Sequence, residues 1–79
     1  MSNTVTVYTK PSCVQCVATK RALDKAGIAY DLIDVTEDGA AFDRLVAAGH
    51  SQMPVVETAD ATWAGFNPDR IKALSLTSV

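Results

Sequence analysis

The two cysteines of this 79-residue chain, Cys13 and Cys16, stand three residues apart, where a β-type run meets a helical one. Residues 4–9 are β-branched and aromatic, and the pattern from about residue 13 to residue 26 predicts a helix. Positions three apart on a helix lie about 5–6 Å from each other. A disulfide needs a Cα separation of roughly 4.4–6.8 Å. The unpaired N–H groups and dipole of a helix N-terminus favour a thiolate, so the spacing predicts a reactive Cys13 with Cys16 as its partner.

Two other interpretations compete with this one. The cysteines could be inert core residues, although such residues rarely fall at this spacing on a strand-to-helix junction. They could also be half of a zinc site, but structural zinc normally takes four ligands. The only further soft ligand is His50, which we otherwise interpret as a solvated loop residue. We therefore favour a thiol–disulfide site.

Composition narrows the class of protein. With 79 residues, of which 48% are hydrophobic, we expect a single domain spanning residues 1–79. Seven scattered basic residues are offset by nine acidic ones, so no nucleic-acid partner is expected. No apolar run approaches the roughly 18 residues of a membrane span, and residues 1–4 do not resemble a signal peptide. We expect a monomeric, cytoplasmic protein. Its two cysteines should cycle between dithiol and disulfide, without another cofactor.

Strand and helix patterns alternate along the rest of the chain. The expected strands cover residues 4–9, 28–35, 55–58 and 61–63, and the expected helices cover about 13–26, 40–48 and 68–74. A turn is expected at 59–60 and a frayed tail at 75–79. The first strand should be central, and the first strand, helix and second strand form a parallel βαβ unit. Gly27 and Gly49 are expected to end the first two helices, and Asn67 to cap the third.

The helical patterns also predict caps and buried faces. Ser12 with Gln15 resembles a capping box, and Thr36 is expected to cap the second helix. In the first helix the expected apolar stripe is Val14, Val17, Ala18 and Ala22, with Leu23 and Ala26 beside it. The residues of this helix expected to face water are Thr19, Lys20, Asp24 and Lys25. In the second helix the residues expected to face inward are Phe42, Leu45, Val46 and Ala48.

The predicted order β-α-β-α-β-β-α, with a CxxC pair at the head of the first helix, resembles the thioredoxin fold in its minimal glutaredoxin form. This is an α/β fold with a four-stranded mixed sheet and three helices. Met53-Pro54, just before the third strand, matches the family's apolar-proline pair. The resemblance implies that Pro54 is cis and lies against the cysteines. A backbone edge beside the disulfide could then pair with an incoming peptide strand.

Two motifs narrow the resemblance. Cys13-Val14-Gln15-Cys16 and Trp63-Ala64-Gly65-Phe66-Asn67-Pro68-Asp69 are similar to the signatures of the NrdH-redoxins. These glutaredoxin-like proteins reduce class Ib ribonucleotide reductase. The second motif replaces the segment with which ordinary glutaredoxins hold glutathione. The resemblance therefore implies weak glutathione binding and reduction by thioredoxin reductase. Ala64 and Asn67 depart from the family's usual Ser and Arg, which removes a hydroxyl and a cation.

We assign the attack on a target disulfide to Cys13 and the resolving step to Cys16. The candidate partner-binding residues are Lys10, Val14, Gln15, Met53, Pro54, Trp63, Gly65 and Phe66. Lys10 could favour the thiolate, contact an acidic partner or simply be solvated. Trp63 and Phe66 could be core side chains, but for Trp63 we favour an exposed docking patch.

The leading function is a dithiol electron carrier between thioredoxin reductase and the large subunit of class Ib ribonucleotide reductase. The alternatives are a glutathione-dependent dithiol glutaredoxin or general protein disulfide reductase, and a redox-sensing or metal-binding module.

Overall fold

The computed structural model describes residues 5–58 and 61–77 and contains seven helices and strands in this range. They are β1 (Thr6–Thr9), α1 (Val14–Lys25), β2 (Asp31–Asp34), α2 (Gly39–Ala47), β3 (Val55–Glu57), β4 (Thr62–Ala64) and α3 (Pro68–Thr77). The predicted order of elements is confirmed, although the first three strands are shorter than expected and the fourth is shifted by one residue. The predicted turn at residues 59–60 lies outside the described residues.

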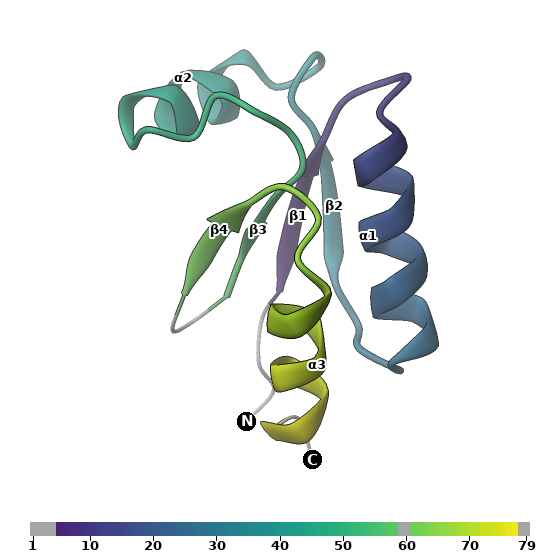
Figure 1. Ribbon diagram of the computed structural model, residues 1–79. Helices are drawn as coiled ribbons and strands as arrows, with labels where there is room; N and C mark the ends of the chain where they lie inside the picture. Colours follow the sequence, from purple (N-terminus) through teal and green to yellow (C-terminus); the bar gives the residue numbers. More distant parts are fainter. Residues whose placement is uncertain (1–4, 59–60, 78–79) are drawn as a thin grey trace.

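The four strands form one mixed sheet in the order β2-β1-β3-β4 (Figure 1). β1 pairs in parallel with β2 and antiparallel with β3, where Val7 lies opposite Val56. β3 and β4 are antiparallel, and Val56 also lies opposite Trp63. The predicted central position of β1 and the parallel pairing of β1 with β2 are therefore confirmed.

Helices cover the two faces of the sheet differently. Successive side chains of a strand point to opposite faces, and Val7 and Val56 belong to a core cluster that includes Leu23 of α1 and Ile71 of α3. Their neighbours Tyr8 and Val55 belong to a second cluster, with Ala41 and Leu45 of α2. Figure 1 shows α1 and α3 beside each other and α2 apart from both.

The buried face of α1 differs from the predicted stripe. Its buried residues are Cys16, Thr19 and Leu23, whereas Val14 is 84% exposed and Val17 is also exposed. The reason is that Cys16 packs into the second core cluster, and this fixes the rotation of the helix about its axis. Thr19 and Leu23, three and seven positions further on, then share its face.

The start of α2 also differs from the prediction. Asp38 is the N-cap, and its side chain accepts a hydrogen bond from the Ala41 N–H at 3.1 Å. The Thr36 hydroxyl instead donates to Asp34 Oδ1 at 2.6 Å, because the chain turns here before the helix begins. Of the apolar residues expected to face inward, only Leu45 is buried; Phe42, Val46 and Ala48 are exposed.

Arg44 connects α2 to the sheet. Its Nη1 donates to Glu57 Oε2 at 3.3 Å, and its Nη2 donates to the Tyr8 hydroxyl. Its guanidinium carbon also lies 5.4 Å from the centroid of the Tyr8 ring, and the Tyr8 hydroxyl donates to Glu57 Oε1 at 3.1 Å. Burial, followed by the Glu57 carboxylate, raises the pKa of Tyr8 above its ordinary value of 10.0, although Arg44 opposes this shift.

The third helix is capped as predicted. Asn67 Oδ1 accepts a hydrogen bond from the Arg70 N–H at 3.2 Å. α3 continues to Thr77, beyond the predicted end at residue 74, and residues 78–79 lie outside the described part of the chain.

The first two helices end at glycines, as predicted. Gly27 follows α1 and Gly49 follows α2, with φ of 74° and 92°. No helix within the described residues is long and apolar enough to cross a membrane.

Candidate redox-active site

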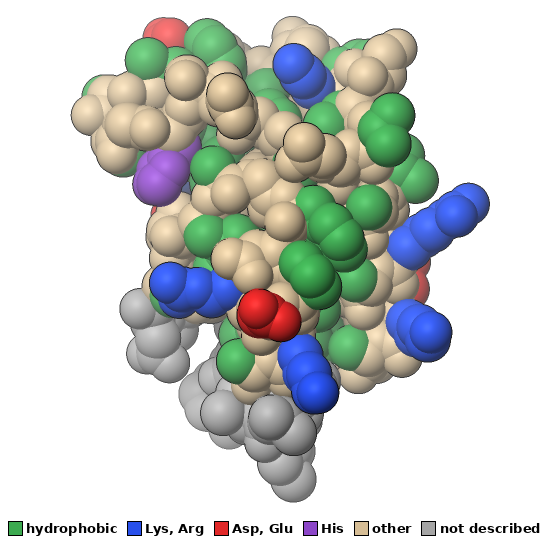
Figure 2. Space-filling view, viewed as in Figure 1, with side chains coloured by type: hydrophobic (Ala, Val, Ile, Leu, Met, Phe, Trp, Pro, Cys, Tyr) green, Lys and Arg blue, Asp and Glu red, His purple; other side chains and the backbone are tan. Residues whose placement is uncertain are grey.

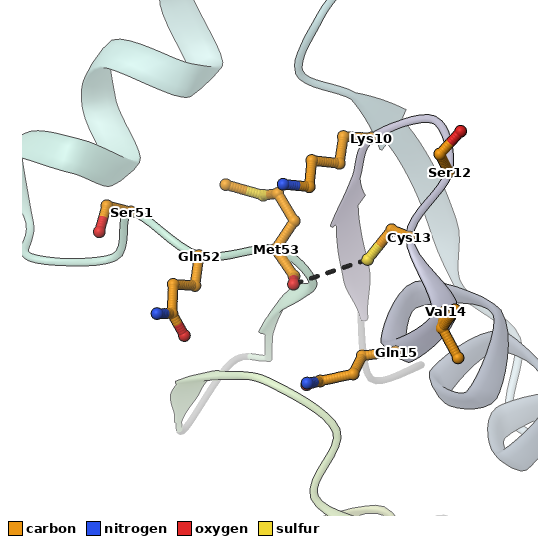
Figure 3. A pocket seen from close by; sticks show the side chains of 8 residues that line it. All are labelled: Lys10, Ser12, Cys13, Val14, Gln15, Ser51, Gln52 and Met53. Atoms are coloured by element: carbon orange, nitrogen blue, oxygen red, sulfur yellow. Dashed lines mark hydrogen bonds between the residues drawn. The ribbon is translucent and has the colours of Figure 1, made fainter.

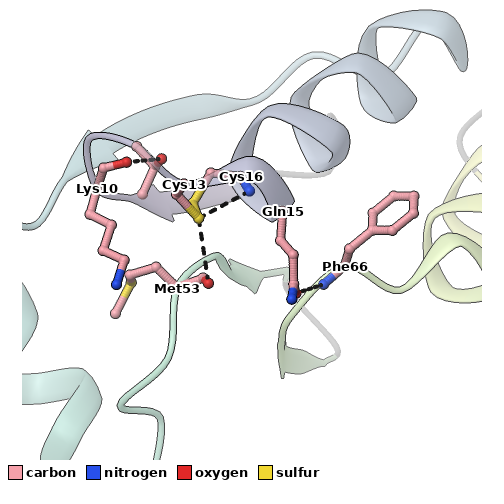
Figure 4. The surroundings of a disulfide bond; sticks show 7 residues. Lys10, Cys13, Gln15, Cys16, Met53 and Phe66 are labelled. Carbon is pink, nitrogen blue, oxygen red and sulfur yellow. Dashed lines mark hydrogen bonds between the residues drawn. A yellow bond between two sulfur atoms is a disulfide. The ribbon is translucent and has the colours of Figure 1, made fainter.

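Cys13 and Cys16 form a disulfide at the N-terminus of α1 (Figure 4). Cys13 is the N-cap residue, with φ −111° and ψ 106°, and Cys16 lies in the first turn. Their Cα atoms are 5.1 Å apart, which agrees with the separation predicted from their spacing. The strand-to-helix junction therefore places the two sulfur atoms where they can be joined or parted by thiol–disulfide exchange.

The backbone around Cys13 favours negative charge on its sulfur. The Cys16 N–H donates to Cys13 Sγ at 3.2 Å, in the manner of an N-cap hydrogen bond. The positive end of the α1 dipole acts on the same atom. The predicted capping box is wrong: Ser12, at φ 58°, lies in the turn before the cap, and Cys13 occupies the cap position instead. The Gln15 side chain is thereby free for a different contact.

The two sulfur atoms differ in their access to solvent. Cys13 is half-buried and lines two surface grooves. Cys16 also borders the second of these grooves, but it is 1% exposed and belongs to the second core cluster. An incoming disulfide can therefore reach Cys13 but not Cys16. This asymmetry is the geometry that an attacking and a resolving cysteine require.

Met53 forms one wall of the groove beside Cys13, and the buried Pro54 follows it in the chain. The Met53-Pro54 peptide bond is cis, as the family resemblance implied. The Met53 carbonyl oxygen lies 3.6 Å from Cys13 Sγ (Figure 3). A thiol at Cys13 could donate to this oxygen, whereas the disulfide has no proton to donate and the approach is then a sulfur–oxygen contact. The Pro54 carbonyl accepts from the Gly65 N–H at 2.8 Å, which ties the end of β4 to this wall.

The groove itself has a volume of about 460 Å³. Eight residues line it: Lys10, Ser12, Cys13, Val14, Gln15, Ser51, Gln52 and Met53. Five of the predicted site residues, Lys10, Cys13, Val14, Gln15 and Met53, are thus brought together around one opening. The sequence did not identify Ser51 and Gln52, because nothing in their local pattern indicates that they lie across from the cysteines.

Gln15 joins the first turn of α1 to the loop after β4. Its Oε1 accepts a hydrogen bond from the Phe66 N–H at 3.2 Å. Gly65, just before Phe66, has a φ of 85°, which other residues rarely adopt, although a Cβ there would make only an ordinary contact at 3.5 Å with the same oxygen. Gly65 and Phe66 therefore belong to the site through Gln15, a contact that sequence reasoning did not predict.

The expectation that Trp63 forms an exposed docking patch is wrong. Trp63 is 7% exposed and packs in the first core cluster, because its position in β4 directs its ring onto the face covered by α1 and α3. Its Nε1 has no hydrogen-bond partner among the described residues. The side chain of Phe66, by contrast, is 40% exposed.

Figure 2 shows one face of the molecule, with exposed hydrophobic side chains among polar ones and Lys and Arg side chains set apart from one another. The exposed hydrophobic residues nearest to Cys13 in the chain are Val14 and Val17 of α1. Within the described residues, no three His, Cys, Asp or Glu side chains are grouped as metal ligands would be.

Comparison with known proteins agrees with this geometry. The glutaredoxin family model matches residues 5–61. The glutaredoxin-like protein NrdH of Salmonella typhimurium is 44% identical over 73 residues, covering 92% of this chain and 90% of its own length. NrdH of Lactococcus lactis is 32% identical over 71 residues, covering 90% and 99%.

Solved structures show the same relationship. The glutaredoxin-like protein NrdH-redoxin from Escherichia coli superposes with a TM-score of 0.88 at 44% identity, over 90% of this chain and 93% of that one. The thioredoxin-like protein BC3987 gives a TM-score of 0.80 at 34% identity, over 89% and 97%. With its cysteine pair at the head of α1, this chain belongs to the glutaredoxin family and, within it, to the NrdH glutaredoxin-like redox proteins.

Proposed function

We propose that this protein is a small dithiol electron carrier that reduces the disulfide of the large subunit of class Ib ribonucleotide reductase. In this proposal it is itself re-reduced by thioredoxin reductase. The observation that carries the proposal is the asymmetry of the cysteine pair. Cys13 is accessible and receives the Cys16 N–H at 3.2 Å, while Cys16 is 1% exposed beneath it. The similarity to NrdH proteins over most of the chain supports the choice of partner.

The proposed transfer has two exchanges. The Cys13 thiolate attacks one sulfur of the target disulfide; that S–S bond breaks, and the other target sulfur leaves as a thiolate and takes up a proton. Cys16 then loses its proton and attacks Cys13 Sγ, which forms the Cys13–Cys16 disulfide and releases the second target thiol. Two electrons and two protons pass to the target. The N–H donor and the helix dipole at Cys13 favour the thiolate that starts this sequence.

Re-reduction reverses these exchanges, with NADPH as the electron source through thioredoxin reductase. One contact supports this choice over glutathione. In the segment that replaces the glutathione-binding residues of ordinary glutaredoxins, the Phe66 N–H already donates to Gln15 and the Phe66 ring is 40% exposed. That segment offers few free polar groups for the carboxylates of glutathione. The related NrdH-redoxin of Escherichia coli is described as having a thioredoxin-like activity profile, which agrees with this choice.

A reductase-preference assay tests the proposal. The oxidised protein is incubated with NADPH and thioredoxin reductase, or with NADPH, glutathione and glutathione reductase, and the oxidation of NADPH is followed. We expect rapid reduction only in the first mixture, and none for Cys13→Ser, which cannot form the disulfide. Reduction by glutathione alone would instead support the alternative, a glutathione-dependent dithiol glutaredoxin or general protein disulfide reductase.

The partner assignment needs a second assay. Class Ib ribonucleotide reductase is supplied with NADPH and thioredoxin reductase, with or without this protein, and deoxyribonucleotide formation is measured. We expect formation to depend on the protein and to be lost with Cys13→Ser. If formation is the same without the protein, the assignment of this partner is wrong.

The proposed cycle uses no cofactor besides the cysteine pair and proceeds with a monomer. It requires a reducing compartment such as the cytoplasm.

A further inference from the structure

A second recess adjoins the Cys13 groove on the far side of Met53. It has a volume of about 400 Å³ and is lined by Lys10, Val35, Thr36, Phe42, Ser51 and Met53. Lys10, Ser51 and Met53 also line the groove beside Cys13. The two hollows therefore meet along these three residues, so a chain seated at Cys13 can extend toward the second.

Met53 lies between the two hollows, with its backbone carbonyl on the side of Cys13 and its side chain on the side of the second recess. Its carbonyl oxygen lies 3.6 Å from Cys13 Sγ, while Figure 3 shows its side chain directed away from that sulfur and toward the end of Lys10. The backbone of Met53 thus faces the reacting sulfur, and its thioether faces the second recess. In an extended chain, every second side chain points the same way, and these side chains are about 6–7 Å apart. A partner strand bound at Cys13 can therefore place one of its side chains in the second recess.

The lining of the recess combines an apolar floor with a single cation. Val35 and Met53 are 6% and 7% exposed, and Phe42 of α2 is 40% exposed. Contact with an apolar side chain of a partner would remove the exposed part of Phe42 from water. The Thr36 hydroxyl is engaged as a donor to Asp34. Lys10 has no ion-pair partner within the described residues.

We infer that this recess, defined by Phe42, Met53 and Lys10, is a specificity pocket for the partner protein. Its occupant is an extended segment beside the partner's redox cysteine that carries an apolar side chain for Phe42 and Met53 and a carboxylate for Lys10. This inference rests on the proposed dithiol function and adds to it the chemistry of the partner's flanking residues. Charge complementarity at Lys10 and continuity with the Cys13 groove are the reasons for this choice of occupant.

Synthetic peptides of one length, each with an internal disulfide, test the inference. In the three peptides the residues beside the cysteines are Leu and Glu, Ser and Glu, and Leu and Lys, respectively. The reduced protein is mixed with each peptide in turn, and the rate of peptide reduction is measured. We expect the Leu-Glu peptide to be reduced about five- to tenfold faster than the Ser-Glu peptide. We also expect it to be reduced about two- to fivefold faster than the Leu-Lys peptide, a difference that falls with salt.

Variants assign these preferences to residues. Phe42→Ala should bring the Leu-to-Ser rate ratio close to one, and Phe42→Leu should keep most of it. Lys10→Glu should reverse the preference between Glu and Lys. Val46→Ala is the matched control, since Val46 is on the same helix and 44% exposed but does not line the recess; it should leave both ratios unchanged. Thermal melting of each variant checks that it is folded.

Two outcomes would overturn the inference in different ways. If the wild-type protein reduces all three peptides equally fast, or if Phe42→Ala and Lys10→Glu keep the wild-type ratios, the recess does not select the partner, although the dithiol function stands. If the wild-type protein reduces neither the peptides nor a small aromatic disulfide, the dithiol function itself fails, and the specificity pocket fails with it.

Discussion

The Oε1 atom of Gln15 accepts a hydrogen bond from the Phe66 N–H at 3.2 Å and thereby joins two segments that are 51 residues apart in the chain. One segment carries the cysteine pair, and the other begins the loop that leads to α3. The contact fixes the Gln15 side chain at the edge of the groove beside Cys13 (Figures 3 and 4). It makes the second sequence motif part of the redox site.

Replacing Gln15 by Ala should loosen this connection. The Phe66 N–H would lose its acceptor, and because the bond is exposed we expect only about 0.5–1.5 kcal/mol of lost stability. Hydrogen exchange of the Phe66 amide should become faster. Gln52→Ala is the control, since Gln52 lines the same groove without a hydrogen bond to a described residue. Unchanged exchange at Phe66 in Gln15→Ala would mean that the contact does not form in solution.

The exposure of the two cysteines predicts opposite behaviour for their serine variants. Cys16→Ser should accumulate a mixed disulfide between Cys13 and the target, because the accessible sulfur can still attack but nothing displaces the target. Cys13→Ser should form no adduct, since Cys16 is 1% exposed. Non-reducing electrophoresis followed by mass spectrometry of the adduct provides the measurement. An adduct formed through Cys16 would reverse the two roles.

Trp63→Ala should act on folding rather than on partner recognition. The ring is 7% exposed within the first core cluster, so its removal should cost about 3–5 kcal/mol of stability. Trp63→Phe should cost less, about 1–2 kcal/mol, because the indole Nε1 has no hydrogen-bond partner among the described residues to lose. Denaturant unfolding and the transfer rate per folded molecule are compared. A transfer rate that falls in fully folded Trp63→Phe would restore a docking role for the indole.

Tyr8 should make the protein less stable at alkaline pH. Burial and Glu57 raise its pKa in the folded state above 10.0. Above pH 10 the unfolded chain releases this proton before the folded protein does, so the free energy of unfolding falls as pH rises through the folded pKa. Below pH 10 the contribution is fully present.

Denaturant unfolding between about pH 8 and pH 11 tests this dependence. Tyr8→Phe should make the decline shallower. Part of it should remain, because burial and Asp24 also raise the pKa of Tyr30. Tyr30→Phe therefore serves as the comparison variant. Equal declines in the wild type and Tyr8→Phe would show that Tyr8 ionises alike in the folded and unfolded chains.

The sequence alone determined the order of the elements, the Cys13–Cys16 spacing, the glycine ends of α1 and α2 and the Asn67 cap. These features are local: they follow from hydrophobic period, turn residues and the unpaired N–H groups of a helix start, all of which lie within a few neighbouring positions. The family resemblance added the cis bond at Pro54, which the structure contains.

Only the tertiary structure decided which faces are buried and which distant groups meet. Thr19 is buried and Val14 exposed because the packing of Cys16 sets the rotation of α1, and a single helix period allows several such rotations. Trp63 lies inside because β4 pairs with β3 in one register. The Gln15–Phe66 contact depends on groups brought together by the whole fold, since no local pattern specifies a hydrogen bond between residues 51 positions apart.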